Sequence, residues 1–273
     1  MAAQQSMDQS SIKPLEKEPA TRLMDNYRNE INLRLSGNRS IDDLLYWGNQ
    51  NENKLSAFSV PVNELGVFNN LVGITKIIFS FGLEDAKTAY APRLTVLIQG
   101  RNDNGTIQSD YYQLLKGIPT SQSLPVYGTP TTSSGLAVPK FLFDTWTLSW
   151  KEMSDSSAMK AKFCTIDVID TFINVGDQDI VTKPLEKYIF NISDAINILY
   201  PGQLTISQSS ITKLYLCMVS HIATNTNGNV ENFDKARIGM VMGIAEKTNH
   251  NPETYEFISS GYDFSAPCPP TCP

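Results

Sequence analysis

The first clear pattern in the chain is a series of apolar residues spaced four apart near its start. They are Leu23, Tyr27, Ile31 and Leu35. This spacing places side chains on one face of an α-helix. Pro19 suits the first turn of such a helix, since proline lacks the N–H that has no partner there. Gly37 is placed to end the helix in a left-handed conformation. We therefore predict a helix over residues 19–36.

Further along, apolar residues alternate or cluster in the way that is typical of β-strands. Residues 57–62 alternate, and residues 74–82 and 94–100 are two strongly apolar segments. The sequence Asn102-Asp103-Asn104-Gly105 follows. An Asn-Gly pair favours a type I′ turn, because both central residues of that turn need a positive φ. We predict that this turn leads into a third strand over Ile107–Leu115, which completes an antiparallel meander.

Short helices are predicted between these elements. Ser40 is followed three residues later by Asp43, which resembles a capping box at the start of a helix. Asn63 is placed to cap a second short helix that ends near Leu71.

The second half of the chain repeats this order of elements. A helix begins at Asp144 or Thr145, although a strand is the alternative there. Thr165 and Ser193 are placed to cap two short helices. The predicted ranges are 166–172 and 194–200 for these helices, and 211–220, 236–244 and 253–260 for three strands.

Five short matches link the two halves in the same order along the chain. They are Ser40-Ile41-Asp42 with Thr165-Ile166-Asp167, Val62–Leu65 with Ile192–Ala195, Ile74–Phe79 with Ile211–Leu216, Leu94–Ile98 with Ile238–Met242, and Tyr111–Leu114 with Tyr255–Ile258. The offsets are 125, 130, 137, 144 and 144 residues. Because the offset never decreases, insertions in a second copy would explain it. The matches predict a divergent tandem duplication.

The stretch over residues 118–139 is dominated by Pro, Gly, Ser and Thr and carries no charge, which is typical of a linker. We therefore predict a flexible arm over 1–14, a first unit over 15–117, this linker, a second unit over 140–264 and a Pro/Cys tail over 265–273. The predicted fold class is α+β, with two tandem, divergent copies of a helix-plus-antiparallel-meander unit.

Composition narrows the class of protein. The 273 residues are 41% hydrophobic and 18% charged, with a net charge of −6, so the chain can bury a core. The absence of a basic block argues against nucleic acid as the main partner. The absence of an apolar run near 18 residues argues against a membrane span. The start of the chain lacks a Sec signal pattern, so we expect a cytoplasmic protein or one exported by another route.

Two parts of the chain resemble a group of uncharacterised small bacterial proteins. The first part is Phe79–Glu84 with Leu94–Gly105, which has an aromatic-Gly-Leu strand end, a Leu/Val-rich strand and an Asn/Asp-x-Asn-Gly hairpin. The second is the C-terminal Pro267-Cys268-Pro269-Pro270-Thr271-Cys272. The resemblance covers about residues 20–115 and the tail, whereas this chain is doubled. It implies a fold and a bacterial origin, and it implies no activity.

Motifs for catalysis or cofactors are missing from the sequence. Neither His221 nor His250 has a partner at metal-ligand spacing, and the glycine-rich nucleotide loops and the Gly-x-Ser-x-Gly elbow do not occur. The acid pairs at 42–43 and 167–170 fit helix capping better than glycosidase chemistry. We therefore predict a protein that is not an enzyme, with no cofactor and no metal.

Two groups of residues are candidates for contacts. The tail cysteines Cys268 and Cys272 could form a disulfide, cross-link subunits, bind a soft metal or have no role. The aromatic residues could stack on a sugar, although core packing is the more common use; they are Trp47, Trp146, Trp150, Tyr111, Tyr112 and Tyr255. We expect a structural or assembly protein that self-associates as a homo-oligomer or docks on other subunits. The alternative is a module that binds carbohydrate or another small ligand.

Overall fold

The computed structural model describes fifteen stretches of the chain. They are residues 14–37, 39–46, 54–60, 72–85, 92–117, 137–138, 140–154, 159–160, 163–168, 180–191, 212–220, 238–250, 253–257, 261–262 and 266–268. The helices within them are α1 (Lys17–Ser36), α2 (Asp42–Leu45) and α4 (Lys140–Glu152).

The strands form two large sheets and one separate pair. From the first part of the chain come β1 (Pro14–Leu15), β2 (Ala57–Val60), β3 (Lys76–Leu83), β4 (Leu94–Arg101), β5 (Tyr111–Gln113) and β6 (Leu115–Gly117). From the second part come β7 (Ala137–Val138), β8 (Cys164–Val168), β9 (Ile180–Pro184), β10 (Lys187–Asn191), β11 (Thr212–Ser220), β12 (Ile238–His250), β13 (Glu253–Phe257), β14 (Gly261–Tyr262) and β15 (Ala266–Cys268).

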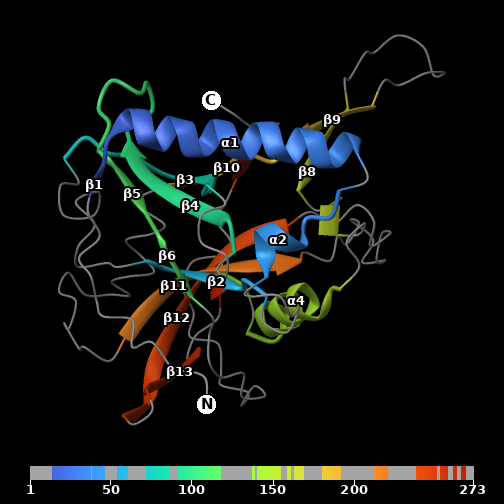
Figure 1. The fold of residues 1–273 in the computed structure, drawn as a ribbon. Coiled ribbons are helices and arrows are strands. Elements are labelled where there is room, and N and C mark those ends of the chain that lie inside the picture. The colour runs from blue at the N-terminus through green and yellow to red at the C-terminus, as the bar shows by residue number, and fades with distance from the viewer. Residues whose placement is uncertain are drawn as a thin grey trace.

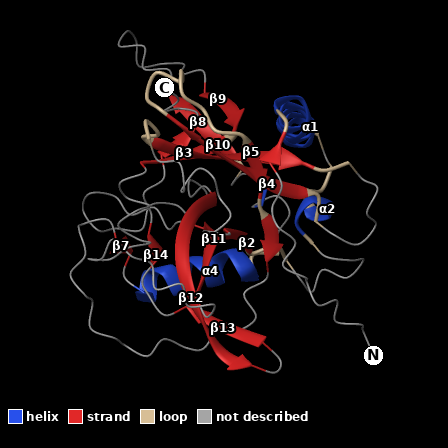
Figure 2. Cartoon of the chain, turned by 90° about the vertical axis from the view of Figure 1, so that its left-hand side faces the viewer, coloured by secondary structure: helices blue, strands red, loops and turns tan. Residues whose placement is uncertain are grey.

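The first sheet has the strand order β1-β5-β4-β3-β10-β15. The second has the order β7-β14-β12-β11-β2-β6, with β13 beside β12, and β8 pairs with β9 separately. The two large sheets lie one above the other, with α1 against β3 and α4 against β11 (Figures 1 and 2). This arrangement of helices and antiparallel sheets confirms the predicted α+β class.

One apolar core joins both sheets and both long helices. Strand β3 is buried from Ile77 to Leu83, which fits its nearly continuous apolar sequence. The Tyr27 ring of α1 stacks on Phe81 at 5.3 Å, and Phe79 meets Phe190 of β10 edge to face at 5.0 Å. Aromatic pairs of this kind add specific geometry to the burial of apolar area.

Most of the longer elements confirm their predictions. The helix predicted over 19–36 is α1, and the helix that begins near Asp144 is α4, which starts earlier at Lys140. The strand alternative for that segment is wrong. The strands predicted over 74–82, 94–100, 211–220 and 236–244 are β3, β4, β11 and β12.

Residues 164–168 are a strand, so the helix predicted over 166–172 with Thr165 as its cap is wrong. This strand, β8, pairs with β9 from Cys164 opposite Pro184 to Val168 opposite Ile180. Its residues Thr165, Ile166 and Val168 are β-branched, and such side chains favour strands over helices.

The third strand of the first meander is shorter than predicted. Strand β5 covers only Tyr111–Gln113, of which Tyr112 and Gln113 pair with β4, and the chain then passes into β6 of the second sheet. The turn is also wider than a two-residue type I′ turn. Asn102 N–H donates to the Ile107 carbonyl at 3.0 Å, Ile107 N–H donates to the Asn102 side chain at 3.0 Å, and Gly105 has a φ of 70°.

Two predicted helix ends differ from the structure. Gly37 has an extended φ of −123° and is not left-handed. The Ser36 hydroxyl donates to the carbonyl of Asn32 at 2.9 Å and to that of Leu33, one of the last four carbonyls of α1, at 3.4 Å. The Ser40 hydroxyl accepts from Asp42 N–H at 3.0 Å, but the Asp43 carboxylate binds Arg34, so the two do not form the predicted capping box.

Some predictions fall on residues outside the described stretches. These include the short helices over 63–71 and 194–200, and residues 1–13 of the predicted arm. Residues 137–138 of the predicted linker form β7, and residues 266–268 of the predicted tail form β15.

Candidate functional site: the contact between the two halves

The feature that stands out in this fold is the exchange of strands between residues 14–117 and residues 137–268, which we call the N-half and the C-half. Strand β10 of the C-half pairs with β3 of the N-half, with Ile189 opposite Ile78. Strand β2 of the N-half pairs with β11 of the C-half, with Phe58 opposite Leu216. Each half therefore supplies two strands that complete the other half's sheet.

Each long helix also holds the segment just before an exchanged strand. The Tyr27 hydroxyl of α1 donates to the carbonyl of Leu185, two residues before β10, at 2.7 Å. The Trp150 indole N–H of α4 donates to the carbonyl of Leu55, two residues before β2, at 2.9 Å. Both side chains are buried. Buried hydrogen bonds of this kind cost stability when one partner is removed.

Lys54, next to Leu55, is a buried lysine that binds the end of α4. Its Nζ donates to the carbonyls of Trp150 at 2.7 Å and Met153 at 2.9 Å, and lies 3.7 Å from the centre of the Trp150 ring. The last carbonyls of a helix lack partners within the helix, and a lysine can satisfy them. Burial lowers the pKa of Lys54 to about 7, and the negative charge of Asp42 acts in the opposite direction.

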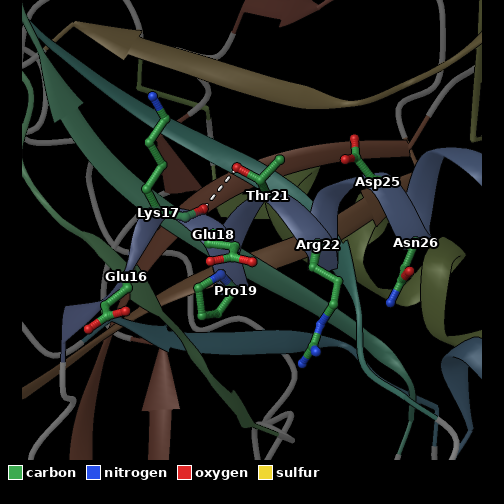
Figure 3. Close-up of a pocket in the computed structure, with 8 residues that line it drawn as sticks. All are labelled: Glu16, Lys17, Glu18, Pro19, Thr21, Arg22, Asp25 and Asn26. Atoms are coloured by element: carbon green, nitrogen blue, oxygen red, sulfur yellow. Dashed lines mark hydrogen bonds between the residues drawn. The ribbon is translucent and has the colours of Figure 1, made fainter.

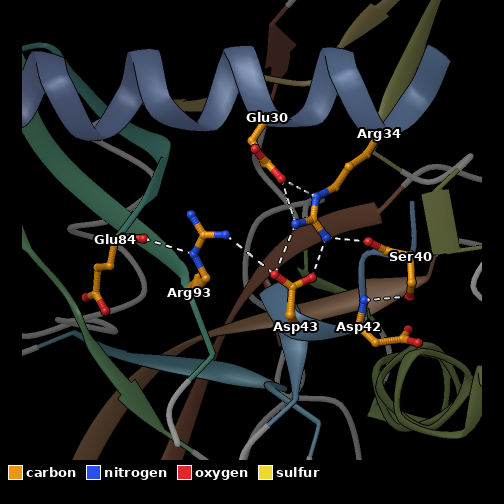
Figure 4. Close-up of polar contacts among 7 residues, drawn as sticks. All are labelled: Glu30, Arg34, Ser40, Asp42, Asp43, Glu84 and Arg93. Carbon is orange, nitrogen blue, oxygen red and sulfur yellow. Dashed lines mark hydrogen bonds and ion pairs between the residues drawn. The ribbon is translucent and has the colours of Figure 1, made fainter. Parts of the chain in front are cut away.

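A charged network ties α1 to α2 and to the ends of β3 and β4 (Figure 4). Arg34 of α1 is buried and binds Glu30 at 2.6 Å and the carboxylate of Asp43 at 3.0 Å. Burial acts against its charge, but the hydrogen bonds to Asp43 and Glu30 outweigh this and raise the pKa of Arg34. Arg93 reaches Asp43 at 3.5 Å and donates to the Glu84 carbonyl at 3.2 Å.

The other end of this network reaches β6. Lys116 forms an ion pair with the carboxylate of Glu84, and Gln113 donates to the same carboxylate. Since β6 belongs to the second sheet, these contacts connect the two sheets within the N-half. Buried or partly buried ions are tolerated when they are paired in this way.

An outer contact between the halves lies on the exposed side of α1. Arg28 binds the Glu186 carboxylate with its Nε at 2.6 Å and also pairs with Asp25 at 2.9 Å. The hydrogen bond to Glu186 is the main reason that the pKa of Arg28 is raised.

The predicted aromatic residues whose side chains the structure describes lie on β5 and α4. Trp150 and Tyr112 are part of the apolar core. Tyr111 is partly buried on β5, and Trp146 is half-buried on α4. Tyr255 lies on β13, and Trp47 lies outside the described residues.

The two predicted tail cysteines and the predicted histidines are also only partly described. Cys268 lies on β15 opposite Lys187 of β10, whereas Cys272 lies outside the described residues. His250 ends β12, and His221 lies outside the described residues. Among the described residues, we find no group of three or more His, Cys, Asp or Glu side chains that could hold a metal ion.

A surface hollow lies beside the first turns of α1 (Figure 3). The described residues that line it are Glu16, Lys17, Glu18, Pro19, Thr21, Arg22, Asp25 and Asn26. Their side chains spread around the outside of the helix and do not converge on one point. The one hydrogen bond drawn there runs from the Thr21 hydroxyl to the Lys17 carbonyl at 2.8 Å, within the helix itself. A ligand site usually needs polar groups that converge, so this hollow supports none.

No family model, curated protein or solved structure matches this chain. None of the helices in the described stretches is long and apolar enough to cross a membrane. The structural features that carry most information are therefore the chain's own strand exchange and the buried contacts of Tyr27, Lys54 and Trp150. The sequence placed Tyr27 on an apolar stripe and gave no role to Lys54.

Proposed function

We propose that the protein is a non-catalytic structural protein, a building block that self-associates or docks on a larger assembly. The observation that carries this proposal is the reciprocal strand exchange. Because β2 and β10 are each paired in the other half's sheet, the two halves are joined through backbone hydrogen bonds over long sequence distances. The two sheets end in the short edge strands β1 and β15, and β6 and β7.

We also propose that the two halves are divergent copies of one unit. The registers of the exchanged strands support this. In the first sheet Ile77 lies opposite Phe190, and in the second Leu214 lies opposite Val60. Residue 214 follows 77 by 137 positions, and 190 follows 60 by 130 positions. These are two of the offsets found by sequence matching, so both sheets have the same register at equivalent positions.

The order of strands gives the same correspondence. Read from β1, the first sheet is β1-β5-β4-β3-β10-β15; read from β7, the second is β7-β14-β12-β11-β2-β6. In each, four strands come from one half and the last two from the other. Ile77 lies opposite Gly100, and Leu214 lies opposite Ile244, which keeps the offsets of 137 and 144.

One of the five sequence matches needs correction under this proposal. Tyr112 of β5 lies opposite Ile98, and Tyr262 of β14 lies opposite Met242. Ile98 and Met242 are equivalent at an offset of 144, so the counterpart of β5 is β14. Strand β13, matched to β5 by sequence, pairs instead with Ala245–His250. An insertion of about six residues between β12 and β14 accounts for the change from 144 to 150, and β13 occupies it.

The tail supports docking through its cysteines rather than through an added strand. Its residues Ala266–Cys268 form β15, the outer strand of the first sheet. The prolines around Cys268 cannot donate to a further strand, so we place the contact of this edge at the cysteine. Cross-linking through Cys268 and Cys272 is the proposed role of the tail.

The test is size-exclusion chromatography with light scattering over a concentration series, with electron microscopy of the same fractions. We expect oligomers, rings or filaments, and we expect Cys268→Ser with Cys272→Ser or added reductant to reduce them. A strict 30.3 kDa monomer at every concentration would contradict self-association. Glycan-array binding would then test the alternative of a carbohydrate-binding module, which loses support from the burial of Trp150 and Tyr112.

A further inference from the structure

We infer that the chain folds as a fused, strand-exchanged dimer: the N-half and the C-half are obligate partners, and the face that each presents to the other fits a second copy of the same unit. This inference rests on the proposed duplication. Its partner is defined chemically as a unit that supplies two strands and two backbone carbonyls, and that receives the same from its neighbour.

Each half alone would lack partners for strands of its sheet. Without the C-half, β3 loses the partner that covers it from Lys76 to Ser80. Without the N-half, β11 loses the partner that covers it from Leu214 to Cys217. Strands β2 and β10 would each keep only one short edge neighbour, β6 or β15. Unpaired strands expose backbone N–H and carbonyl groups, which favours association.

The apolar core is shared between the two halves. The Phe81 ring of the N-half contacts two aromatic rings of the C-half, Phe163 at 6.2 Å and Tyr188 at 6.3 Å. All three side chains are at most 2% exposed in the full chain. Separation of the halves would bring these buried rings into contact with water, which is unfavourable for large apolar side chains.

The hydrogen bonds between the halves come in equivalent pairs. Tyr27 donates to Leu185, and Trp150 donates to Leu55. Trp150 follows Tyr27 by 123 positions, and Leu185 follows Leu55 by 130. The same shift relates the starts of the helices, since Lys140 follows Lys17 by 123.

A second pair follows the same rule. Phe81 N–H donates to the Glu186 carbonyl at 2.8 Å, and Met218 N–H donates to the Ser56 carbonyl at 2.8 Å. Met218 follows Phe81 by 137 positions, and Glu186 follows Ser56 by 130. Each half therefore carries both the donor and the acceptor of each contact, which is the property of a two-fold dimer interface.

The experiment uses the full chain with a protease site inserted between residues 127 and 128, in the Pro/Ser/Thr/Gly-rich stretch. After folding and cleavage, we expect the two pieces to elute together at the mass of the intact chain and to separate only in denaturant. Elution of two folded, separate pieces under native conditions would overturn the inference. A denaturing gel shows whether the chain has been cleaved. If it has not, a longer insert around the protease site is used before elution is compared.

Variants sharpen the test. Tyr27→Phe and Trp150→Phe each remove one donor across the contact, and we expect each to weaken association of the cleaved pieces about tenfold. Thr21→Ala is the control, since the Thr21 hydroxyl bonds only within α1, and it should leave association unchanged. Equal association of all three variants would contradict the role given to these bonds. The oligomeric state of the intact chain is measured separately. If the intact chain does not self-associate, the association of the two cleaved pieces still tests this inference.

Discussion

Replacement of Lys54 by methionine should remove a pH dependence of stability that the buried amine creates. Methionine keeps an apolar stem of similar length, so the packing against Trp150 is largely retained. The variant loses the Nζ that donates to the Trp150 and Met153 carbonyls, which gives a constant destabilisation of about 1–3 kcal/mol. The difference in unfolding free energy between the natural chain and Lys54→Met therefore has a constant part and a pH-dependent part. Measurement at two pH values separates them.

The sign of that part follows from the pKa of Lys54, which falls from 10.5 in the unfolded chain to about 7 in the fold. Below pH 7 both states hold the proton, and the cost of the buried charge is fully present. Between pH 7 and 10.5 only the unfolded chain binds it, so stability rises with pH. The full shift corresponds to about 5 kcal/mol at about 1.36 kcal/mol for each unit. Between pH 6 and pH 9.5 the gain is about 3 kcal/mol.

The assay is urea unfolding at pH 6 and pH 9.5 for the natural chain, Lys54→Met and the control Lys17→Met, whose side chain is exposed on α1. The gap in unfolding free energy between the natural chain and Lys54→Met should widen by about 3 kcal/mol in favour of the natural chain at the higher pH. Lys17→Met should follow the natural chain. Parallel pH dependence in the natural chain and Lys54→Met would refute the reasoning.

Four further substitutions test other contacts, each by urea unfolding at pH 7. Tyr27→Phe should cost about 1–2 kcal/mol, because a buried carbonyl loses its donor. Trp150→Phe should cost at least as much, because the carbonyl of Leu55 loses its donor and the smaller ring also leaves a cavity. Losses below about 0.5 kcal/mol would contradict this. Gly82→Ala should cost about 1–3 kcal/mol, since the new Cβ would lie 3.0 Å from Thr95 and 3.2 Å from Leu23; a neutral or stabilised variant would show that α1 can shift. Arg34→Met should cost about 2 kcal/mol or more, because Glu30 loses its partner and Asp43 keeps only the 3.5 Å contact with Arg93, and an unchanged midpoint would refute it.

The sequence predicted the long elements well, because each carries a period that only one structure satisfies. The four-residue spacing from Leu23 to Leu35 defines α1, and the apolar runs define β3, β4, β11 and β12. Short segments were predicted less well. In the stretch Cys164–Val168, the hydroxyl of Thr165 suits a helix cap. The β-branched residues of the stretch and its pairing with β9 nevertheless favour a strand.

The exchange of strands was not predictable from the local pattern. A strand such as Lys187–Asn191 has the same alternation whichever sheet it joins. Sequence matching did supply the offsets of 130 and 137, which later agree with the registers of the exchanged strands. It contained no information on which half each strand would join, since partners in a sheet are chosen by tertiary packing. Lys54 was missed for a related reason, because its carbonyl partners at Trp150 and Met153 lie far away in sequence.

Under the proposed duplication, Lys54 has no lysine counterpart in the C-half. At an offset of 130, the equivalent of Lys54 is Pro184, which cannot donate at all. The carbonyls that Lys54 binds, at residues 150 and 153, correspond to residues 27 and 30 of α1 at the offset of 123. There the helix continues to Ser36, so those carbonyls accept from N–H groups four residues further on. In the C-half the helix ends at Glu152, and its last carbonyls need an outside donor. The shorter helix and the buried lysine therefore depend on each other, because the lysine binds the carbonyls that the shorter helix leaves without partners. A mutation that extended α4 would leave Lys54 buried without acceptors.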